Sequence, residues 1–514
     1  INPRHKIPVI KARAGAYNIL QRKYSLEVIC MKRFVCLLLS AGLVSGTAVF
    51  FAGCQKTQSP DTRYAITAEY LPETSTITGM VKLEWRNAGG EEISALRFNL
   101  WANAYREGAA HRPVSPVHSA SAYYDGTSYG SMEISSVSGA ESWEVTGEDE
   151  NILSVSLDEP LYPGDRVTLD IGFRTRLAEV NHRTGVTENT VNLGNFFPIL
   201  CGRSAGDFYE CVYYPDGEPF FSDCADYSVT LTVPREYTVA STGKIQSKKA
   251  LESKKEYTMS ASNARDFALV LSDCFEVVEC REGDVSVMYY YYDDEQPAAH
   301  LALAREALGY YAGTFGDYPY ETYSVVQTGF CYGGMEYPAL SMISDDLGEK
   351  DLLYTIAHET AHQWWYAAVG SNPAENAWQD EGLAEYSSAL FFENHPDYGY
   401  TREGLAADAL EEYRAYYSVY SQVFGDADTC MTRSLGDYLS EYEYRCIAYD
   451  KGMVMLDTLR ESIGDKKFFE GLKRYYSSYK FKIARPADLV GCFERTGVDV
   501  AGFFDSFLSG KAVL

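Results

Sequence analysis

The chain has 514 residues, of which 46% are hydrophobic, so it can bury a large core and is long enough for two or three domains. Its formal net charge is −27 at pH 7. Residues 1–53 hold eight Lys or Arg and one Glu, and removing their net +7 leaves −34 on the rest, which argues against nucleic acid as a partner.

The first part of the chain is predicted to be a targeting segment and not part of a folded domain. Residues 1–30 are basic and unpatterned, and we interpret them as a non-native upstream extension with Met31 as the start. A basic start at Met31 and an apolar run over Phe34–Phe51, followed by Cys54, predict a signal peptide over 31–53.

This segment resembles a bacterial lipoprotein signal, although Phe51 stands where the usual pattern has Leu. The resemblance implies that Cys54 is lipidated and that residues 54–63 form a tether. A retained membrane helix over Phe34–Phe51 is the alternative, because that run is at the short limit for spanning a bilayer. Either interpretation places the protein at the bacterial cell membrane, facing outside the cytoplasm.

Residues 64–290 alternate between apolar and polar side chains. The clearest runs are Val81–Arg86, Val167–Phe173 and Val229–Val233. A period of two is typical of strands with one buried face. We therefore predict an N-terminal β domain over 64–290, built as an antiparallel sheet or sandwich.

The period changes after Asp293, and residues 291–480 are predicted to be a mostly helical domain. Helices are expected near 295–315, 350–369, 380–394, 402–423, 444–462 and 465–479, and strands near 322–328 and 338–344. Residues 481–514 are then a short helical C-terminal segment, too short for a further large domain.

The second domain contains His358-Glu359-Thr360-Ala361-His362, with Glu381 following after eighteen residues. On a helix, His358 and His362 share a face and can bind one divalent ion. Glu381 supplies a third metal ligand, and Glu359 projects beside the site as the base for an attacking water. The pattern predicts one Zn²⁺ per chain, although cobalt or manganese could bind the same ligands in vitro.

Two further motifs accompany the metal motif. Gly333-Gly334-Met335-Glu336-Tyr337-Pro338 lies upstream, and Tyr449-Asp450-Lys451-Gly452 lies downstream. Together with the metal motif they resemble the aminopeptidase N family of zinc peptidases. The resemblance implies that Glu336 holds the free α-ammonium of the substrate, beside Gly333, Gly334 and Met335. It also implies that Tyr449 donates a hydrogen bond to the oxyanion. Tyr444 is expected to be a pocket wall.

The resemblance covers roughly residues 64–480, because Phe98–Tyr105 and Ala264–Ala268 are similar to segments of the family's N-terminal domain. It implies an α+β multidomain fold, with an N-terminal antiparallel β-sandwich or saddle domain before a thermolysin-like, mostly helical catalytic domain. Two points depart from the family. Tyr337 replaces the usual Asn, and neither Glu218 nor Asp226 sits in a motif that identifies the second amine-binding residue.

The predicted function is a membrane-tethered extracytoplasmic zinc aminopeptidase, with Glu359 as general base and peptides with a free N-terminus as substrates. Three alternatives stay open. They are a zinc endopeptidase, a hydrolase of a non-peptide substrate, and a non-catalytic surface-binding lipoprotein. The sequence does not indicate the oligomeric state.

Cysteine usage gives a weaker indication. Of twelve cysteines, Cys201, Cys211 and Cys224 form one cluster and Cys274 and Cys280 another, which would allow one or two disulfides in an exported protein. Cys331, just before the Gly-Gly turn, is expected to be a free thiol near the active site.

Overall fold

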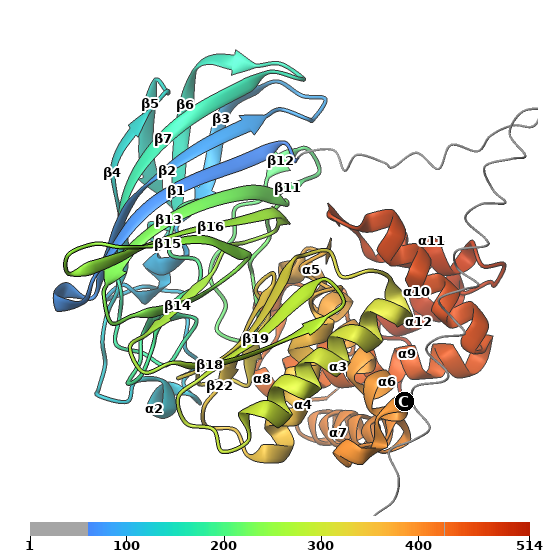
Figure 1. Cartoon of the computed structure of the whole chain (residues 1–514). Helices are drawn as coiled ribbons and strands as arrows, with labels where there is room; N and C mark the ends of the chain where they lie inside the picture. The colour runs from blue at the N-terminus through green and yellow to red at the C-terminus, as the bar shows by residue number, and fades with distance from the viewer. Residues whose placement is uncertain (1–59, 426) are drawn as a thin grey trace, which may run out of the picture. The chain divides into compact units, whose positions relative to one another are not determined.

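The structure is a computed structural model that describes residues 60–425 and 427–514 (Figure 1). Within the chain, Ser59–Leu514 forms one compact unit. In the described ranges, no helix has both the length and the apolar composition to cross a membrane. The predicted upstream extension, the signal peptide and Cys54 lie outside the described residues.

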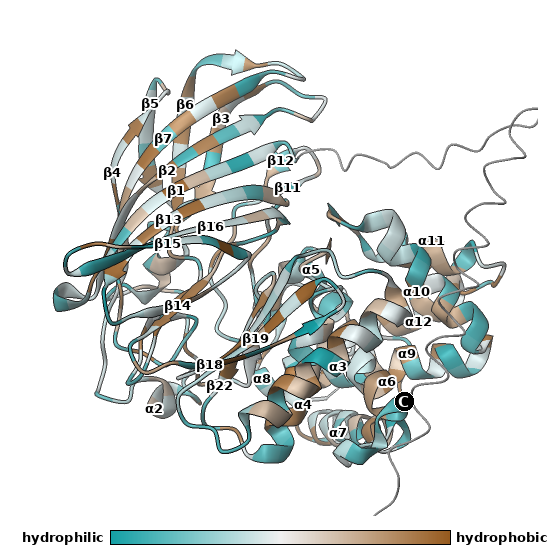
Figure 2. Cartoon of the chain, in the orientation of Figure 1, coloured by the Kyte–Doolittle hydropathy of each residue, from teal (hydrophilic) through white to brown (hydrophobic). Residues whose placement is uncertain are grey.

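A seven-stranded sheet dominates the N-terminal region. Its order is β15 (Lys244–Ala250), β16 (Lys254–Ala264), β13 (Ala225–Pro234), β1 (Thr62–Leu71), β2 (Thr76–Arg86), β7 (Arg166–Arg176) and β4 (Ser131–Ser138). The predicted alternation is visible along these strands in Figure 2, and in β1 the side chains of Tyr64, Ile66 and Ala68 are buried while their neighbours are exposed. One pair differs from the antiparallel prediction, because β1 and β13 run parallel. A period of two reports burial and not strand direction.

Two four-stranded sheets complete this region. One has the order β10 (Ile199–Leu200), β3 (Ile93–Asn99), β6 (Ile152–Leu161) and β5 (Ser142–Thr146); the other has β14 (Thr238–Ser241), β17 (Leu269–Ser272), β9 (Val191–Leu193) and β8 (Thr184–Val186). A short hairpin pairs β11 (Arg203–Ser204) with β12 (Asp207–Phe208), and α2 spans Ser119–Ala122. The larger sheets share one hydrophobic core, so they stabilise one another.

The second region is built on a five-stranded sheet covered by helices (Figure 1). The order is β18 (Glu276–Glu282), β19 (Val285–Tyr291), β20 (Thr322–Thr328), β22 (Leu340–Ser344) and β21 (Gly334–Met335). β20 pairs in parallel with both β19 and β22, and every residue of it is buried. This is typical of a central strand with both faces covered.

The helices follow the predicted order. They are α3 (Pro297–Phe315), α4 (Glu349–Ala361), α5 (Pro373–Asn376), α6 (Trp378–Asn394), α7 (Arg402–Val423), α8 (Glu441–Arg445), α9 (Lys451–Ile463), α10 (Asp465–Tyr479), α11 (Pro486–Glu494) and α12 (Ala501–Leu508). The predicted helix 350–369 is too long, since α4 ends at Ala361. Tyr366 has a φ of 128°, and Val369–Gly370 forms strand β23, which pairs with β24 at Lys482–Ile483.

Two close contacts hold the helical region together. Gly382 in α6 and Gly452 in α9 touch so closely that a Cβ on Gly452 would lie 2.8 Å from the Gly382 Cα. Lys451 is fully buried, and its Nζ donates to the carbonyls of Thr429 (2.7 Å) and Phe507 (3.0 Å). The glycine pair therefore sets the α6–α9 crossing, and Lys451 connects α9 to α12.

The nine cysteines in the described part of the chain are all free. The disulfides that the sequence left open between Cys201, Cys211 and Cys224, or between Cys274 and Cys280, are thus not formed in the structure.

Candidate active site

Helix α4 presents two histidine rings to one point, and helix α6 adds a carboxylate. His358 Nε2 and His362 Nε2 lie 3.0 Å apart. Glu381 Oε2 lies 3.2 Å from His362 Nε2 and 3.5 Å from His358 Nε2. The three buried donors converge as the spacing of the motif predicts, since residues four apart share a helix face.

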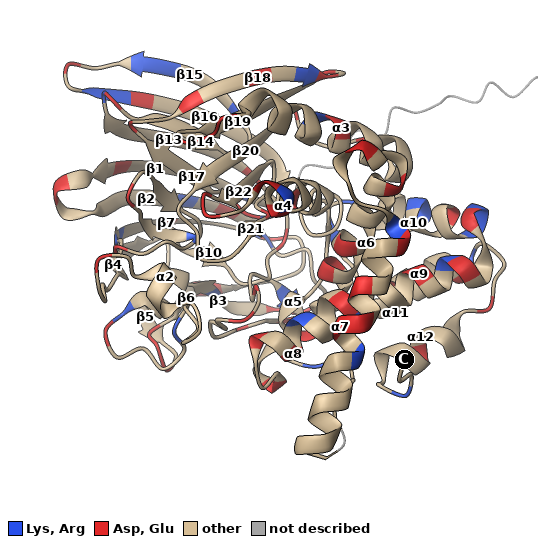
Figure 3. Ribbon diagram, turned by 90° about the horizontal axis from the view of Figure 1, so that it is seen from below, with Lys and Arg blue, Asp and Glu red and all other residues tan. Residues whose placement is uncertain are grey.

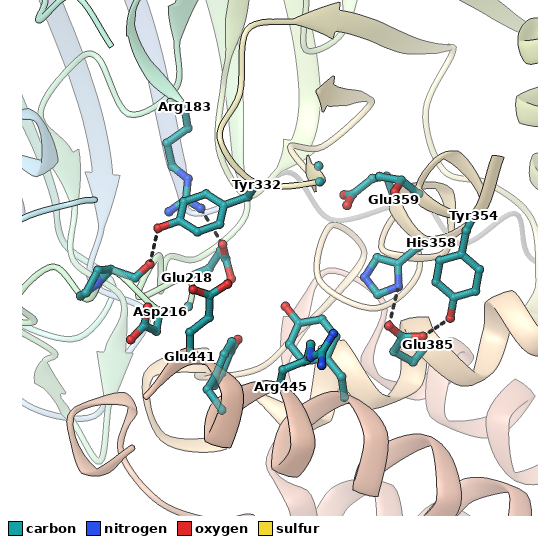
Figure 4. Close-up of a pocket in the computed structure, with 17 residues that line it drawn as sticks. Arg183, Asp216, Glu218, Tyr332, Tyr354, His358, Glu359, Glu385, Glu441 and Arg445 are labelled. Carbon is teal, nitrogen blue, oxygen red and sulfur yellow. Dashed lines mark hydrogen bonds and ion pairs between the residues drawn. The ribbon is translucent and has the colours of Figure 1, made fainter. Parts of the chain in front are cut away.

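Each histidine ring is oriented by a second group. His362 Nδ1 lies 2.9 Å from the Trp365 carbonyl and donates to it, which leaves Nε2 free to bind a metal. His358 Nδ1 faces Glu385 Oε1 at 3.8 Å, and the Tyr354 hydroxyl donates to the same carboxylate (Figure 4). Glu385 lies one helical turn after Glu381, and this spacing was the sequence signal that could have identified it.

The donor set fits zinc. Glu381 Oε2 and His358 Nδ1 are buried without a hydrogen-bond partner among the described residues. Burial raises the pKa of Glu381, but His362 and His358 outweigh it and hold that pKa at about 2, so the carboxylate is ionised. Two imidazoles and one carboxylate are a ligand set of catalytic zinc sites, in which a fourth position stays open.

Glu359 lies beside these donors, and its carboxylate packs closely against Gly334. A Cβ on Gly334 would lie 2.3 Å from Glu359 Oε1, so only glycine allows β21 to approach α4 this closely. Burial, together with the negative charge of Glu336, raises the pKa of Glu359. Glu359 Oε2 has no hydrogen-bond partner among the described residues. Gly333 precedes the strand, and Met335 is buried against Met342.

Two carboxylates from distant parts of the chain lie next to the metal donors. One oxygen from each of Glu218, Glu336 and Glu381 lies within 4.8 Å of the others. Arg183 Nη2 donates to Glu218 Oε1 at 2.6 Å. Burial raises the pKa of Glu218 to about 8 against the opposing charge of Arg183. Asp226 lies elsewhere, on β13, where its Oδ1 accepts from the backbone of Asn263.

Tyr337 points away from this pocket. Its side chain is fully buried, and its hydroxyl donates to Asn195 Oδ1 at 2.9 Å. A Cβ on Gly194 would lie 1.9 Å from that hydroxyl, so Gly194 makes room for it. Tyr337, which stands in place of the family's Asn, therefore contacts the N-terminal region through Asn195, and the carboxylate of Glu336 stays beside the metal donors.

Tyr449 lies on a π-helical turn, Cys446–Asp450, between α8 and α9. Its ring stacks on His358 with centroids 6.0 Å apart, and the Tyr444 ring packs against it edge-on at 5.5 Å. Burial raises the pKa of Tyr449, so its hydroxyl keeps its proton. Both rings line the pocket, as predicted for Tyr444.

The pocket has a volume of about 400 Å³. Glu441 lines the pocket, and His118 Nε2 lies 2.9 Å from each of its carboxylate oxygens. The Tyr332 hydroxyl donates to the Pro215 carbonyl at 3.0 Å (Figure 4). Several lining residues belong to no sequence motif: Arg183, Asp216, Tyr354, Glu385, Glu441 and Arg445. Cys331 is free and half-buried, and it does not line this pocket.

Comparison with known proteins gives a consistent assignment. Residues 300–507 match the model of the peptidase family M1 domain. The chain is 27% identical to aminopeptidase N of Lactococcus lactis subsp. lactis over 259 residues, which are 48% of this chain and 27% of that protein. It is 25% identical to glutamyl aminopeptidase of Rattus norvegicus over 300 residues, which are 53% of this chain and 30% of that protein. The chain thus spans less than a third of the length of these relatives.

A solved structure matches nearly the whole chain. The M1 zinc metallopeptidase from Deinococcus radiodurans aligns with a TM-score of 0.60 over 89% of this chain and 95% of that chain, at 18% identity. This likeness confirms the predicted fold class, a sheet-rich N-terminal domain followed by a helical one. The matched domain over residues 300–507 and the relatives support an assignment to the aminopeptidase N-like M1 peptidase family.

Proposed function

We propose that the protein is a zinc aminopeptidase that removes N-terminal residues from peptides. The observation that carries the proposal is the position of Glu336 and Glu218 beside the metal donor Glu381. Carboxylates at this position bind a cationic amine by charge-assisted hydrogen bonds. A substrate whose ammonium group is held there presents its first peptide bond to the metal donors, which makes the enzyme an exopeptidase.

The chain's own residues supply the remaining chemistry. Glu359 removes a proton from the attacking water and passes it to the departing amine. Tyr449, which keeps its proton over the working pH range, donates a hydrogen bond to the oxyanion that develops in the transition state. His358, His362 and Glu381 would hold the zinc ion, which would supply a Lewis acid for the carbonyl and for the attacking water.

The test compares one fluorogenic peptide carrying a free or an acetylated amino end. We expect zinc-loaded protein to cleave the free form only, and the Glu359→Gln variant to cleave neither. A chelator should abolish cleavage and added zinc should restore it. Equal cleavage of both peptides would show an endopeptidase instead. No cleavage of either peptide by zinc-loaded protein would favour a non-peptide hydrolase or a binding protein.

We also propose that the enzyme is anchored to the membrane by a lipid attached to Cys54 and that it acts outside the cytoplasm. The support is the basic start, apolar run and cysteine of residues 31–54. Cells fed a clickable fatty acid should label the wild-type chain and the Cys36→Ala control, and the label should disappear in Cys54→Ala. Equal labelling of wild type and Cys54→Ala would contradict this proposal.

A further inference from the structure

Helix α10 carries a row of basic side chains on a strongly acidic protein. Lys466 and Lys473 are seven residues apart, or about two helical turns, so they lie on one face of the helix, and Lys480 follows at the same interval as the C-cap residue just past its end. The opposite face buries Phe468, Leu472 and Tyr475 in the core. In Figure 3 the ribbon of α10 carries blue basic residues, in a helical region with many red acidic residues. We call these three lysines the α10 basic stripe.

The stripe lines an open groove of about 820 Å³ between α10 and the end of α3. Lys466 and Lys473 are exposed, and no carboxylate in the described ranges lies within 4.0 Å of either ammonium group. Glu470 is the acidic residue of α10 that lies in the groove, and it is paired with Arg474 at 2.9 Å. Asp317 also lines the groove and lies near Lys480, so the positive charge available to a partner is that of Lys466 and Lys473.

A series of contacts connects the start of β1 with Lys482, two residues after the end of the stripe. Thr62, the first residue of β1, pairs with Ala225 of β13. Three residues before Ala225, the Ser222 carbonyl accepts from Arg265 Nη1 at 2.7 Å, and Arg265 Nη2 donates to the Lys482 carbonyl at 3.3 Å.

We propose that the α10 basic stripe docks the protein on a membrane containing anionic phospholipid. Each lysine near such a surface is attracted to it, and a single lipid chain binds a membrane only marginally without a second signal. The exposed ammonium groups of Lys466 and Lys473, on long stems, suit a field of headgroups better than one small anion, which is usually bound by a rigid arginine fork. The stripe would act together with the tether proposed at Cys54, but the attraction does not depend on it.

The experiment uses residues 59–514, which form one compact unit. Sedimentation with vesicles of phosphatidylcholine alone is compared with vesicles containing one third phosphatidylglycerol. We expect binding only to the anionic vesicles, weakened by salt, and between about tenfold and a hundredfold weaker for the triple variant Lys466→Gln, Lys473→Gln, Lys480→Gln.

The matched control is Lys244→Gln, Lys248→Gln, Lys249→Gln, which removes the same charge from the exposed lysines of β15. It should bind anionic vesicles like the wild type, and both variants should unfold at the wild-type temperature. Equal loss of binding in the two triple variants would overturn the proposal, because net charge alone would then explain binding. Retention of the wild type on polyglutamate but not on anionic vesicles would also overturn it and indicate an acidic polymer as the partner.

Discussion

Glu218 and Asp226 are eight residues apart, yet only Glu218 reaches the pocket. If Glu218 binds the substrate ammonium, Glu218→Gln should raise the KM for free-amine peptides by roughly tenfold to a hundredfold, because one charge-assisted hydrogen bond is weakened. Asp226→Asn is the control and should leave KM unchanged. Since Arg183 loses its ionic partner in the variant, the thermal midpoint is measured alongside. An unchanged KM in a folded Glu218→Gln variant would contradict the assignment.

Glu385 does not reach the metal donors directly, but it faces the back of the His358 ring. Such carboxylates fix the orientation and basicity of a ligating histidine. We expect Glu385→Gln to weaken zinc affinity by roughly tenfold to a hundredfold, measured by competition with a chromophoric chelator. The exposed Glu411→Gln on α7 is the control, and equal affinities in the two variants would show that Glu385 has no positioning role.

The crossing of α6 and α9 shows how a helix-level contact affects the site. A Cβ on Gly452 would lie 2.8 Å from the Gly382 Cα, while a Cβ on Gly313 of α3 would meet nothing within 4 Å. Ala normally stabilises a helix relative to Gly by about 1 kcal/mol. We therefore expect the two variants to differ in their free energy of unfolding, measured in urea. Gly313→Ala should be neutral or stabilising, and Gly452→Ala should destabilise the protein by about 1–3 kcal/mol through overpacking.

The same contact positions catalytic groups. Glu381 precedes Gly382, and Tyr449 lies three residues before Gly452, so separating the helices moves a metal donor relative to the tyrosine. Gly452→Ala should accordingly lose activity in excess of its loss of folded protein. A variant with unchanged stability and activity would show that the helices can separate without cost.

Lys451 makes the stability of α9 depend on pH. Burial lowers its pKa to about 8, compared with about 10.5 for an exposed lysine. Between these two values the unfolded chain binds a proton that the folded chain does not, so this residue makes the free energy of unfolding increase as pH rises.

The free energy of unfolding is measured against pH for the wild type and for Lys451→Met, and the difference between the two curves isolates this contribution. The difference should rise with pH from about 8 to about 10.5, by roughly 1–3 kcal/mol. The exposed Lys466→Met is the control and should give a flat difference curve. A flat curve for Lys451→Met as well would mean that Lys451 titrates like an exposed lysine.

The sequence predicts most strongly what is local and periodic. The helix at α7 and the strand at β20 match the expected ranges 402–423 and 322–328, because hydrophobic periodicity reports the burial of a continuous element. The motif spacing brings His358 and His362 together for the same reason. The predicted end of this helix, at residue 369, was wrong. The turn that follows α4 depends on the pairing of β23 with β24, and β24 lies more than a hundred residues later in the chain.

Glu218 could not be assigned from the sequence. It lies in an irregular loop, so no period indicates where its side chain points, and its carboxylate is placed by Arg183 from another segment. Likewise the partner of Tyr337 is Asn195, 142 residues earlier in the chain. Contacts of this kind depend on tertiary structure and leave no short-range pattern.

At the scale of the whole molecule, Arg265 joins the two regions. It is buried, and it donates to the carbonyls of Ser222 (2.7 Å), Tyr366 (2.9 Å) and Lys482 (3.3 Å). Arg265→Met would leave these carbonyls without a donor, at a cost of about 3 kcal/mol or more. We expect a lower midpoint and separate thermal transitions for the two regions. Arg63→Met, which removes only ion pairs of 3.9 and 4.0 Å, should keep the wild-type transition.

The position of Glu218 divides the enzyme's capabilities between two stretches of chain. The metal donors and Glu359 all lie within residues 300–507, the part that matches the family domain, whereas Glu218 and Arg183 come from the N-terminal region. Excised alone, the family domain would retain His358, His362, Glu381 and Glu359 but lose Glu218, one of the two carboxylates that we propose bind the substrate ammonium. If the proposed function holds, the N-terminal region of this chain decides which bond is cut, and residues 300–507 decide how it is cut.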